Sequence, residues 1–349
     1  MGSVVIRYRL GKLKVLPSTL VNEIEYGSTF ALYPGQEDII PIFTGNLKWL
    51  SWEEKDRNLT IRVDDNFLEI DSLFEKITTA FLYNLLDFGE VQLLSIDLSD
   101  SSYFKLETIR KRETSQVLQL FNSDLMLGTI FKPYYHLSLH EKIALVEKFI
   151  GMGINIIKED EIFLAPEEQL LDEAKSIQEV MGEHNLYIPN LTHQVNNYNL
   201  IEKLLDCGIK VIMLDFLVTG FRSILRIRQR FPELFLWGHR IGYITFERFI
   251  SIAALGTLAM IAGIDFLHIG TPISNSDIRD KIYLVSHLRQ INSSFIPVFT
   301  KTTPNLLPQL IRSFGKTAVF MACGYFRNEE GKAIDWARVK EWVSKTKNA

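Results

Sequence analysis

Four consecutive ionisable residues, Lys158, Glu159, Asp160 and Glu161, follow an apolar run that begins at Ile154. Unpaired charge beside a hydrophobic core is costly, so a buried strand that ends in this way indicates a specific use for the charges. Because alternate side chains of a strand share a face, Lys158 and Asp160 are expected to point together. Glu161 can join them only if the chain turns after the strand. The alternative is a solvated loop that opens the next helix.

A lysine beside two carboxylates predicts either an ion pair or a metal site. A hard divalent ion such as Mg²⁺ prefers oxygen ligands in octahedral geometry, and Asp160 and Glu161 supply such oxygens. Lys158 can supply one only if its neutral amine captures CO2 as a carbamate. The neighbouring acids oppose loss of the lysine proton, so a metal ion would be needed to hold that carbamate.

From about residue 127 onward, apolar runs typical of strands alternate with stretches of helical periodicity. The expected strands are 127–132, 154–158, 186–190, 210–215, 234–239, 265–270, 295–300 and 317–324. The expected helices are 138–150, 167–181, 199–207, 219–230, 244–262, 276–290, 303–313 and 333–346. Runs this apolar suit parallel strands that are covered on both faces. Eight such units in roughly 220 residues predict an α/β fold, a (β/α)8 TIM barrel over residues 114–349.

Residues 1–113 show a less regular pattern. Strand-like segments occur at Val4–Arg9, Leu59–Val63 and Val91–Leu98, and Ile70–Leu86 has apolar residues at helical spacing. Strands and helices that do not alternate regularly predict a small α+β domain. The more polar residues 103–124 are the expected connection to the barrel.

Chemistry in a (β/α)8 barrel takes place at the C-terminal ends of the strands. The expected ends carry Lys132, Lys158, Asn190, Asp215, His239, Arg240, His268, Thr271, Thr300 and Lys301. A lone histidine is more often a satisfied core or surface group, but lysines and acids gathered at one rim predict an active site. Lys132 could act there as a general base if a metal and neighbouring charge lower its pKa. His268 and Arg240 suit a phosphate or another polar substrate group.

Composition narrows the class of protein. The chain has 349 residues, of which 47% are hydrophobic and 23% charged, with a net charge of −4, as in a soluble globular protein. Lysines and arginines are scattered, which argues against a nucleic-acid partner. The two cysteines lie far apart, which favours a reducing compartment. No apolar run resembles a signal core or is long enough to span a bilayer, so a cytoplasmic protein without a membrane partner is expected.

The motifs at these strand ends form a recognisable set. They are Gly128-Thr129-Ile130-Phe131-Lys132-Pro133, Lys158-Glu159-Asp160-Glu161, Met213-Leu214-Asp215-Phe216, Thr219-Gly220-Phe221, Gly238-His239-Arg240 and His268-Ile269-Gly270-Thr271. The set resembles the large subunit of ribulose-bisphosphate carboxylase (RuBisCO) and the RuBisCO-like proteins of form IV type. Asn84 stands where the family places an active-site asparagine, so the resemblance covers most of the chain in order.

The resemblance implies a ferredoxin-like N-terminal domain, a barrel, and a homodimer with shared active sites. Lys132 is then the base that enolises a ketose phosphate, and His239 is a proton shuttle. Lys158 is the carbamylated lysine that binds Mg²⁺ together with Asp160 and Glu161. Asn84 reaches in from the partner subunit. The positions that correspond to substrate and phosphate binding are Arg240, His268, Thr271, Thr300, Lys301 and Gly324.

The chain also departs from the carboxylases. Tyr134 replaces a second lysine, and Pro-Ile-Ser-Asn-Ser follows Thr271, without the mobile-loop lysine that holds CO2 over the enediolate. Phe299-Thr300-Lys301 replaces a phosphate-binding serine-glycine-glycine stretch, and Cys323-Gly324 replaces a glycine pair. Glycine lets backbone N–H groups approach a phosphate closely, and cysteine does so less well. Carbon fixation is therefore not expected, and a substrate with one phosphate fits better.

Proton abstraction beside a carbonyl, with the enolate held on Mg²⁺, is common to the family. The chain is therefore predicted to be a Mg²⁺-dependent enolase or isomerase of a phosphorylated ketose, with lyase chemistry (decarboxylation) also open. One alternative is the methionine-salvage enolase of 2,3-diketo-5-methylthiopentyl-1-phosphate, although that enzyme has a lysine where Asn84 stands. Another is a degenerate enzyme kept as a binding or regulatory protein. The intact set of Lys132, Lys158 and two acids argues against degeneration.

Overall fold

The computed structural model describes residues 3–22, 24, 50–64, 74, 89–99, 101, 114–121, 124–132, 137–160, 165–331 and 333–348. The chain divides into two compact units. The first is Met1–Glu107 with Gly242–Leu258, and the second is Thr108–Ile241 with Ala259–Ala349. The boundary expected after residue 113 adjoins residues 102–113, which lie outside the described ranges, so it stays a prediction.

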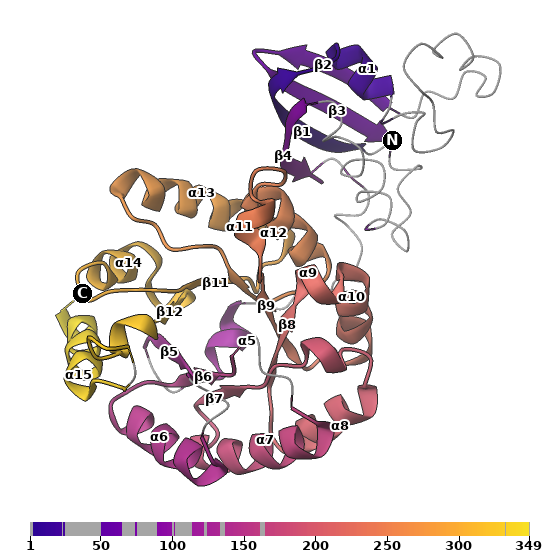
Figure 1. Ribbon diagram of the computed structural model, residues 1–349. Helices are drawn as coiled ribbons and strands as arrows, with labels where there is room; N and C mark the ends of the chain where they lie inside the picture. Colours follow the sequence, from indigo (N-terminus) through magenta and orange to yellow (C-terminus); the bar gives the residue numbers. More distant parts are fainter. Residues whose placement is uncertain are drawn as a thin grey trace. The chain divides into compact units, whose positions relative to one another are not determined.

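The first unit contains a four-stranded sheet in the order β2-β3-β1-β4 (Figure 1). The strands are β1 Ser3–Leu13, β2 Leu50–Lys55, β3 Asn58–Asp64 and β4 Gly89–Asp97. Each neighbouring pair is antiparallel, and this order is that of a ferredoxin-like split βαβ sheet. Val4, Ile6 and Tyr8 of β1 are fully buried, as the alternation of a half-covered strand requires. The expected α+β fold of this unit is confirmed.

The three strands expected in this unit are confirmed as β1, β3 and β4, whereas β2 was not expected. Five of its six residues are exposed, so it lacks apolar alternation. Asp56 and Arg57 join β2 to β3 with φ of 51° and 61°, as a two-residue type I′ hairpin turn requires. The helix expected at Ile70–Leu86 lies, apart from Phe74, outside the described residues.

The second unit is a barrel of eight parallel strands with helices around it (Figure 1). The strands are β5 Met126–Ile130, β6 Ile156–Lys158, β7 Leu186–Ile188, β8 Val211–Asp215, β9 Phe235–His239, β10 Phe266–His268, β11 Ile296–Phe299 and β12 Val319–Met321. Their order is β7-β6-β5-β12-β11-β10-β9-β8. A parallel bridge between Asn190 and Met213 joins the two end strands and completes the ring. All eight expected strands are confirmed.

The helices follow the expected alternation. They are α6 Leu139–Gly151, α7 Glu167–Met181, α8 Tyr198–Asp206, α10 Phe221–Arg230, α12 Ile252–Ile261, α13 Asn275–Ile291, α14 Leu307–Phe314 and α15 Trp336–Ser344. Helix α6 begins at a capping box in which Ser138 and Glu141 bond each other's backbone. The stretch expected as one helix over 244–262 is instead a short α11, Tyr243–Phe246, followed by α12. Across the described ranges, none of the helices has the length and apolar character needed to cross a membrane.

The barrel interior explains why polar residues gather at one end of the strands. Its core contains Met126, Ile156, Leu186, Ile188, Val211, Met213, Phe235, Trp237, Phe266, Ile296, Val298, Val319 and Met321. Helix α5, Thr114–Leu118, and the turn after it add Val117, Leu120 and Phe121 to this core. Inward side chains recur at every second position, so the next inward positions fall at the C-terminal ends of the strands. Those positions are Lys132, Lys158, Asn190, Asp215, His239, His268, Thr300 and Cys323.

Candidate active site

Lys132 and Asp160 lie at the ends of two neighbouring strands. β5 and β6 pair with Ile130 opposite Lys158, and Lys132 and Asp160 each lie two residues further along. The Lys132 Nζ atom is 3.4 Å from Asp160 Oδ1, with side chains 37% and 9% exposed respectively. A largely buried carboxylate therefore holds an amine that a small molecule at the rim can reach.

Lys158 is wholly buried on the inner face of β6. Its Nζ atom donates to Glu159 O at 2.9 Å and to Met213 Sδ at 3.2 Å. Glu159 faces the opposite side of the strand, where its carboxylate accepts bonds from the Tyr187 hydroxyl and, at 2.7 Å, from Asn190 N. Because side chains alternate in direction here, Glu159 points away from the barrel interior and has a structural role. Lys158 and Asp160 point inward.

The described residues offer part of the expected metal site. Asp160 supplies hard carboxylate oxygens, and Lys158 is placed on the same strand to supply a carbamate oxygen, so both fit Mg²⁺ in the chemistry of their donors. Glu161, together with Asn84 and Tyr134, lies outside the described residues. In the part that the structure describes, no group of three or more histidines, cysteines or acids lies close enough to hold a metal ion. The metal roles therefore stay predictions.

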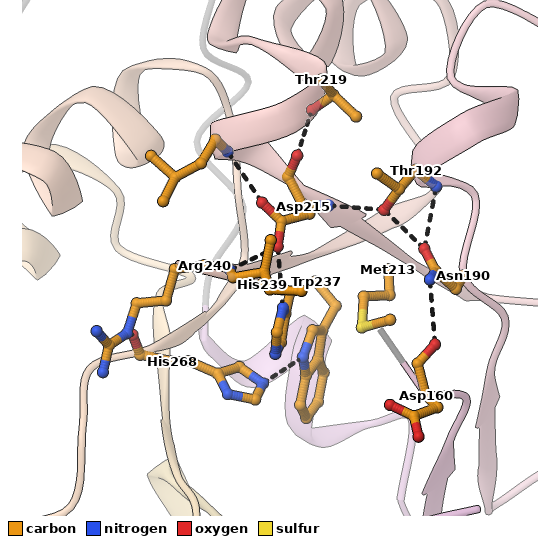
Figure 2. A network of polar contacts seen from close by, with 12 residues as sticks. Asp160, Asn190, Thr192, Met213, Asp215, Thr219, Trp237, His239, Arg240 and His268 are labelled. Carbon is orange, nitrogen blue, oxygen red and sulfur yellow. Dashed lines mark hydrogen bonds and ion pairs between the residues drawn. The ribbon is translucent and has the colours of Figure 1, made fainter. Parts of the chain in front are cut away.

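A buried carboxylate, Asp215, links the end of β8 to the end of β9 (Figure 2). Its Oδ1 atom accepts a bond from Leu217 N at 3.1 Å. Its Oδ2 atom accepts a bond from Ile241 N at 2.6 Å and lies 3.0 Å from His239 Nδ1. Asp215 was expected at a strand end, but no role was predicted for it.

A chain of hydrogen bonds continues from Asp215 toward Asp160 (Figure 2). Asp215 N donates to Thr192 Oγ1 at 3.0 Å, and the Thr192 hydroxyl donates to Asn190 Oδ1 at 2.7 Å. Asn190 Nδ2 then donates to Asp160 O at 3.1 Å. These bonds fix the ends of β6, β7 and β8 relative to one another.

His268 lies on the inner face of β10, where Trp237 Nε1 donates to its Nε2 atom at 2.7 Å. The His239 and His268 rings meet edge to face with centroids 4.9 Å apart. Burial above all, and then the charges of His239, Lys158 and Arg240, hold the pKa of His268 well below its ordinary value. The ring is therefore neutral near pH 7. Because an indole N–H can only donate, the imidazole proton lies on Nδ1.

A pocket of about 610 Å³ opens at the ends of β9, β10 and β11. Four of the predicted substrate-binding residues line it, namely Arg240, Thr271, Thr300 and Lys301. The Arg240 Nε atom donates to His268 O at 2.7 Å, and the Thr271 hydroxyl donates to Thr300 O. Lys301 has a left-handed backbone with φ of 56°, a strained conformation that recurs at functional sites.

Lys281 on α13 adds a cation that sequence patterns did not reveal. Its Nζ atom donates to Ile269 O at 2.6 Å. A Cβ atom at Gly270 (φ 79°) would lie 3.2 Å from Arg240 Nη2 and 3.6 Å from Lys281 Nζ. Two cationic groups therefore approach the chain at Gly270, where the positive φ favours glycine, and they give the pocket a positive field suited to an anion.

The two residues expected at the end of β12 have different surroundings. Gly324 begins the short helix η10, Gly324–Phe326, and is not among the described residues that line the 610 Å³ pocket. A Cβ atom at Gly324 would meet nothing within 4 Å, so the space beside it is open. Burial raises the pKa of the Cys323 thiol, which is therefore protonated and a poor nucleophile at neutral pH.

The sequence of the chain matches a known family. Residues 111–283, about half of the chain, match the model for the ribulose bisphosphate carboxylase large chain, catalytic domain. The chain is 25% identical over 237 residues to the ribulose bisphosphate carboxylase of Methanocaldococcus jannaschii, covering 57% of this chain and 55% of that one. It is 30% identical over 254 residues to that of Thermococcus onnurineus, covering 62% and 57%. The match thus spans little more than half the length of these carboxylases.

Solved structures share the fold over the whole chain. The octameric ribulose-1,5-bisphosphate carboxylase/oxygenase of Pyrococcus horikoshii superposes with a TM-score of 0.78 at 19% identity, covering 100% of this chain and 90% of that one. A rubisco-like protein of Burkholderia fungorum gives a TM-score of 0.73 at 19% identity, covering 100% and 95%. Together with the matching motifs and the barrel, these findings show that the chain belongs to the RuBisCO large-chain superfamily.

Proposed function

We propose that this protein is a RuBisCO-like enzyme of form IV type that enolises a phosphorylated ketose with Mg²⁺ and does not fix CO2. The observation that carries the proposal is the approach of Lys132 Nζ to within 3.4 Å of Asp160 Oδ1, beside the buried Lys158. The residues proposed as lysine base, metal-binding carboxylate and carbamate lysine thus lie at the ends of two paired strands. Enolisation needs these groups together at the C-terminal rim.

Each group has a part in removing a proton beside a carbonyl. Lys132, whose amine is accessible, takes the carbon-bound proton as general base. Lys158 as a carbamate, Asp160 and Glu161 would hold Mg²⁺. The bound ion supplies Lewis-acid polarisation of the substrate carbonyl oxygen. The resulting isomer, enol or decarboxylated sugar depends on where the proton returns.

The pocket at β9, β10 and β11 suits the phosphate end of the substrate. Arg240 is a bidentate anion donor, and Lys281 and Lys301 add positive charge nearby. His268 is buried beside this pocket, where its backbone oxygen accepts a bond from Arg240 Nε, and its neutral ring adds no net charge. The cationic pocket that these described residues form suits the phosphate of a monophosphate substrate.

Two features argue against carbon fixation. The stretch after Thr271 contains no lysine before α13, and its Ile273 is 92% exposed, so no ammonium from this stretch covers the rim. The partly buried Cys323 stands where backbone N–H groups of a glycine pair would bind a second phosphate. Neither position can hold CO2 or a bisphosphate in the way that the carboxylases do.

The partner and compartment follow from the same proposal. We expect a homodimer in which Asn84 completes the neighbour's site, in the cytoplasm, where bicarbonate and sugar phosphates are available. A crystal structure of the RuBisCO of Hyperthermus butylicus, which shares the fold, is of a dimeric protein. Neither nucleic acid nor a membrane is an expected partner.

The test is a screen of ketose monophosphates and bisphosphates in D2O with Mg²⁺ and bicarbonate. The proposal expects Mg²⁺-dependent deuterium incorporation beside the carbonyl of at least one monophosphate, seen by mass spectrometry. It also expects no phosphoglycerate from ribulose 1,5-bisphosphate. CO2-dependent formation of phosphoglycerate, or no exchange with any probe, would contradict it.

A further inference from the structure

We infer that Asp215 is a positioning residue that fixes the tautomer of His239 and leaves Nε2 as the proton acceptor at the barrel rim. The inference rests on the proposed function, because it names the residue that prepares the proton shuttle of that reaction. It also makes a claim about the free protein that can be tested without a substrate.

The Asp215 carboxylate makes three hydrogen-bond contacts at the ends of β8 and β9. The Oδ1 atom accepts Leu217 N at 3.1 Å and so caps the short helix α9, Phe216–Thr219. The Oδ2 atom is turned to the end of β9, where it accepts Ile241 N at 2.6 Å. The helix cap uses Oδ1 alone, so it does not account for the contacts of Oδ2. That second oxygen lies 3.0 Å from His239 Nδ1.

The carboxylate decides which ring nitrogen carries the proton. Both Asp215 oxygens already accept a backbone N–H, so neither is placed to donate to His239. An ionised carboxylate can only accept, so the His239 Nδ1 atom must be the donor. In the neutral ring the other nitrogen, Nε2, is then unprotonated and is the basic atom.

The surroundings of His239 favour a role in proton transfer over a purely structural role. Its side chain is 14% exposed, compared with 5% for Asp215. Figure 2 shows the ring between Asp215 on one side and Trp237 and His268 on the other. The neighbouring His268 cannot take the same role, because its Nε2 atom already accepts from Trp237 Nε1 at 2.7 Å.

The proton transfer balances within the substrate. Lys132 removes the carbon-bound proton, and that electron pair forms the carbon–carbon double bond of the enediolate. His239 Nε2 accepts the proton of the neighbouring hydroxyl as that oxygen becomes the new carbonyl, and gives it to the former carbonyl oxygen. Lys132 returns its proton to the former carbonyl carbon, where the electron pair of the double bond forms the new C–H bond, so both bases end in their starting state. No oxidant or reductant is needed. Asp215 stabilises the transient imidazolium because it accepts the hydrogen bond from Nδ1–H throughout.

The first test is ¹⁵N NMR of the histidine rings in the metal-free, substrate-free protein, at a pH where they are neutral. The pyrrole-type and pyridine-type nitrogens of an imidazole have distinct shifts, and His239→Gln identifies the signals of His239. We expect a protonated Nδ1 and a pyridine-type Nε2. A wild-type ring protonated on Nε2 overturns the inference, whatever the activity is.

The second test compares Asp215→Asn with the matched variant Thr219→Val. Asparagine is isosteric but presents an NH2 group, so the His239 tautomer should shift toward Nε2–H, and exchange into ribulose 1-phosphate or ribulose 5-phosphate should fall at least about 100-fold. Thr219→Val removes the hydroxyl that donates to Asp215 O but keeps the carboxylate, so both the tautomer and the exchange should stay close to wild type. Equal losses in the two variants would mean that Asp215 is only structural.

The two tests separate this inference from the proposed function. An Nδ1–H tautomer that persists in Asp215→Asn overturns the positioning role. Absence of exchange in wild-type protein, with the expected tautomer present, counts against enolisation of these probes and leaves the assignment of Asp215 supported. If Asp215→Asn does not fold, the NMR measurement of the His239 tautomer in wild-type protein still tests the inference.

Discussion

Lys132 and Lys158 lie on neighbouring strands in contrasting surroundings. The Lys132 side chain is 37% exposed beside Asp160, whereas Lys158 is wholly buried against Met213. An accessible amine can reach a bound molecule, while a buried one can act only on its immediate neighbours. The contrast supports giving the role of base to Lys132 and that of metal ligand to Lys158.

Removal of Lys132 should stop the reaction without emptying the metal site. Lys132→Ala should lower deuterium exchange by about 10²–10⁴-fold, because a positioned general base is lost, and should leave Mg²⁺ binding nearly unchanged by calorimetry. Lys203→Ala is the matched control, since it removes a lysine that is 45% exposed and forms a 3.0 Å ion pair with Glu167 outside the site. If Lys132→Ala exchanged at the wild-type rate, another residue would have to be the general base, and His239 would be the next candidate.

His268 should make the stability of the protein depend on pH. Its pKa in the folded protein lies well below 6.5, mainly because of burial. The unfolded chain therefore binds the proton first, so this stability is present above pH 6.5 and is lost as the pH falls toward the folded pKa. The loss approaches about 1.4 kcal/mol per pH unit. His268→Gln keeps an acceptor for Trp237 but does not titrate, so its free energy of unfolding should fall less between pH 6.5 and 5. Equal pH dependence would show that His268 is not buried and neutral.

At the scale of elements, a buried ion pair lies at the end of the barrel opposite the candidate active site. Arg228 of α10 pairs with Asp265, which precedes β10, and both side chains are at most 4% exposed. Asp265 also accepts Leu236 N at 2.9 Å and the Ser294 hydroxyl at 3.0 Å. The Arg228 Nε atom donates to Gly263 O at 3.0 Å. This network joins β9, β10 and β11 at their N-terminal ends, away from the candidate active site.

Asp265→Ala should therefore destabilise the fold while leaving the chemistry of the folded protein intact. Loss of one partner leaves a buried uncompensated guanidinium, which typically costs about 3–5 kcal/mol of unfolding free energy in chemical denaturation. Glu202→Ala is the matched control, because it breaks the 3.1 Å pair with Arg230 whose side chains are 51% and 54% exposed. Its cost should be below about 1 kcal/mol. Similar costs for the two variants would contradict the view that burial makes the Arg228 pair important.

At the scale of the whole molecule, the proposed function expects an active site that two chains share. A homodimer in which Asn84 completes the neighbour's site predicts that Asn84→Ala and Lys132→Ala chains, each inactive, recover part of the exchange when mixed and allowed to swap subunits. Some hybrid dimers then contain one site with both residues intact. Native mass spectrometry would report hybrid formation. Hybrids that form but stay inactive would show that the sites are not shared.

The barrel could be predicted because each of its strands is an apolar run that ends in a polar residue. Side chains alternate along a strand, so the position two residues after a core residue also points inward. Lys158 at the rim follows the core residue Ile156 in this way, and His239 follows Trp237. Strand β2 could not be predicted, since its exposed residues follow no apolar pattern and only the conformation of Asp56 and Arg57 reveals the turn. The single helix expected over 244–262 was wrong, because no periodicity marks the break between α11 and α12.

Roles within the site were harder to predict than its position. Asp215 was a strand-end acid without an assigned partner, because His239 and Ile241 reach it from the next strand only in the folded barrel. Trp237 was indistinguishable from a core residue, although its indole N–H fixes His268. Lys281 lies within a helix, where nothing in the local sequence reveals its approach to Gly270.

The central claim is that the lysine and carboxylate set is a working metal site and not a relic. The most direct measurement is Mg²⁺ affinity by calorimetry in degassed and in bicarbonate-loaded buffer at the same pH, starting from protein shown to be free of bound CO2. If Lys158 becomes a carbamate, CO2 must tighten Mg²⁺ binding, and Mg²⁺ must tighten CO2 capture by the same factor. Lys158→Arg should lose the metal, and Lys158→Glu should keep some binding without dependence on CO2. Equal Mg²⁺ affinities in the two buffers would contradict the carbamate, and no Mg²⁺ binding in either would contradict the enzyme.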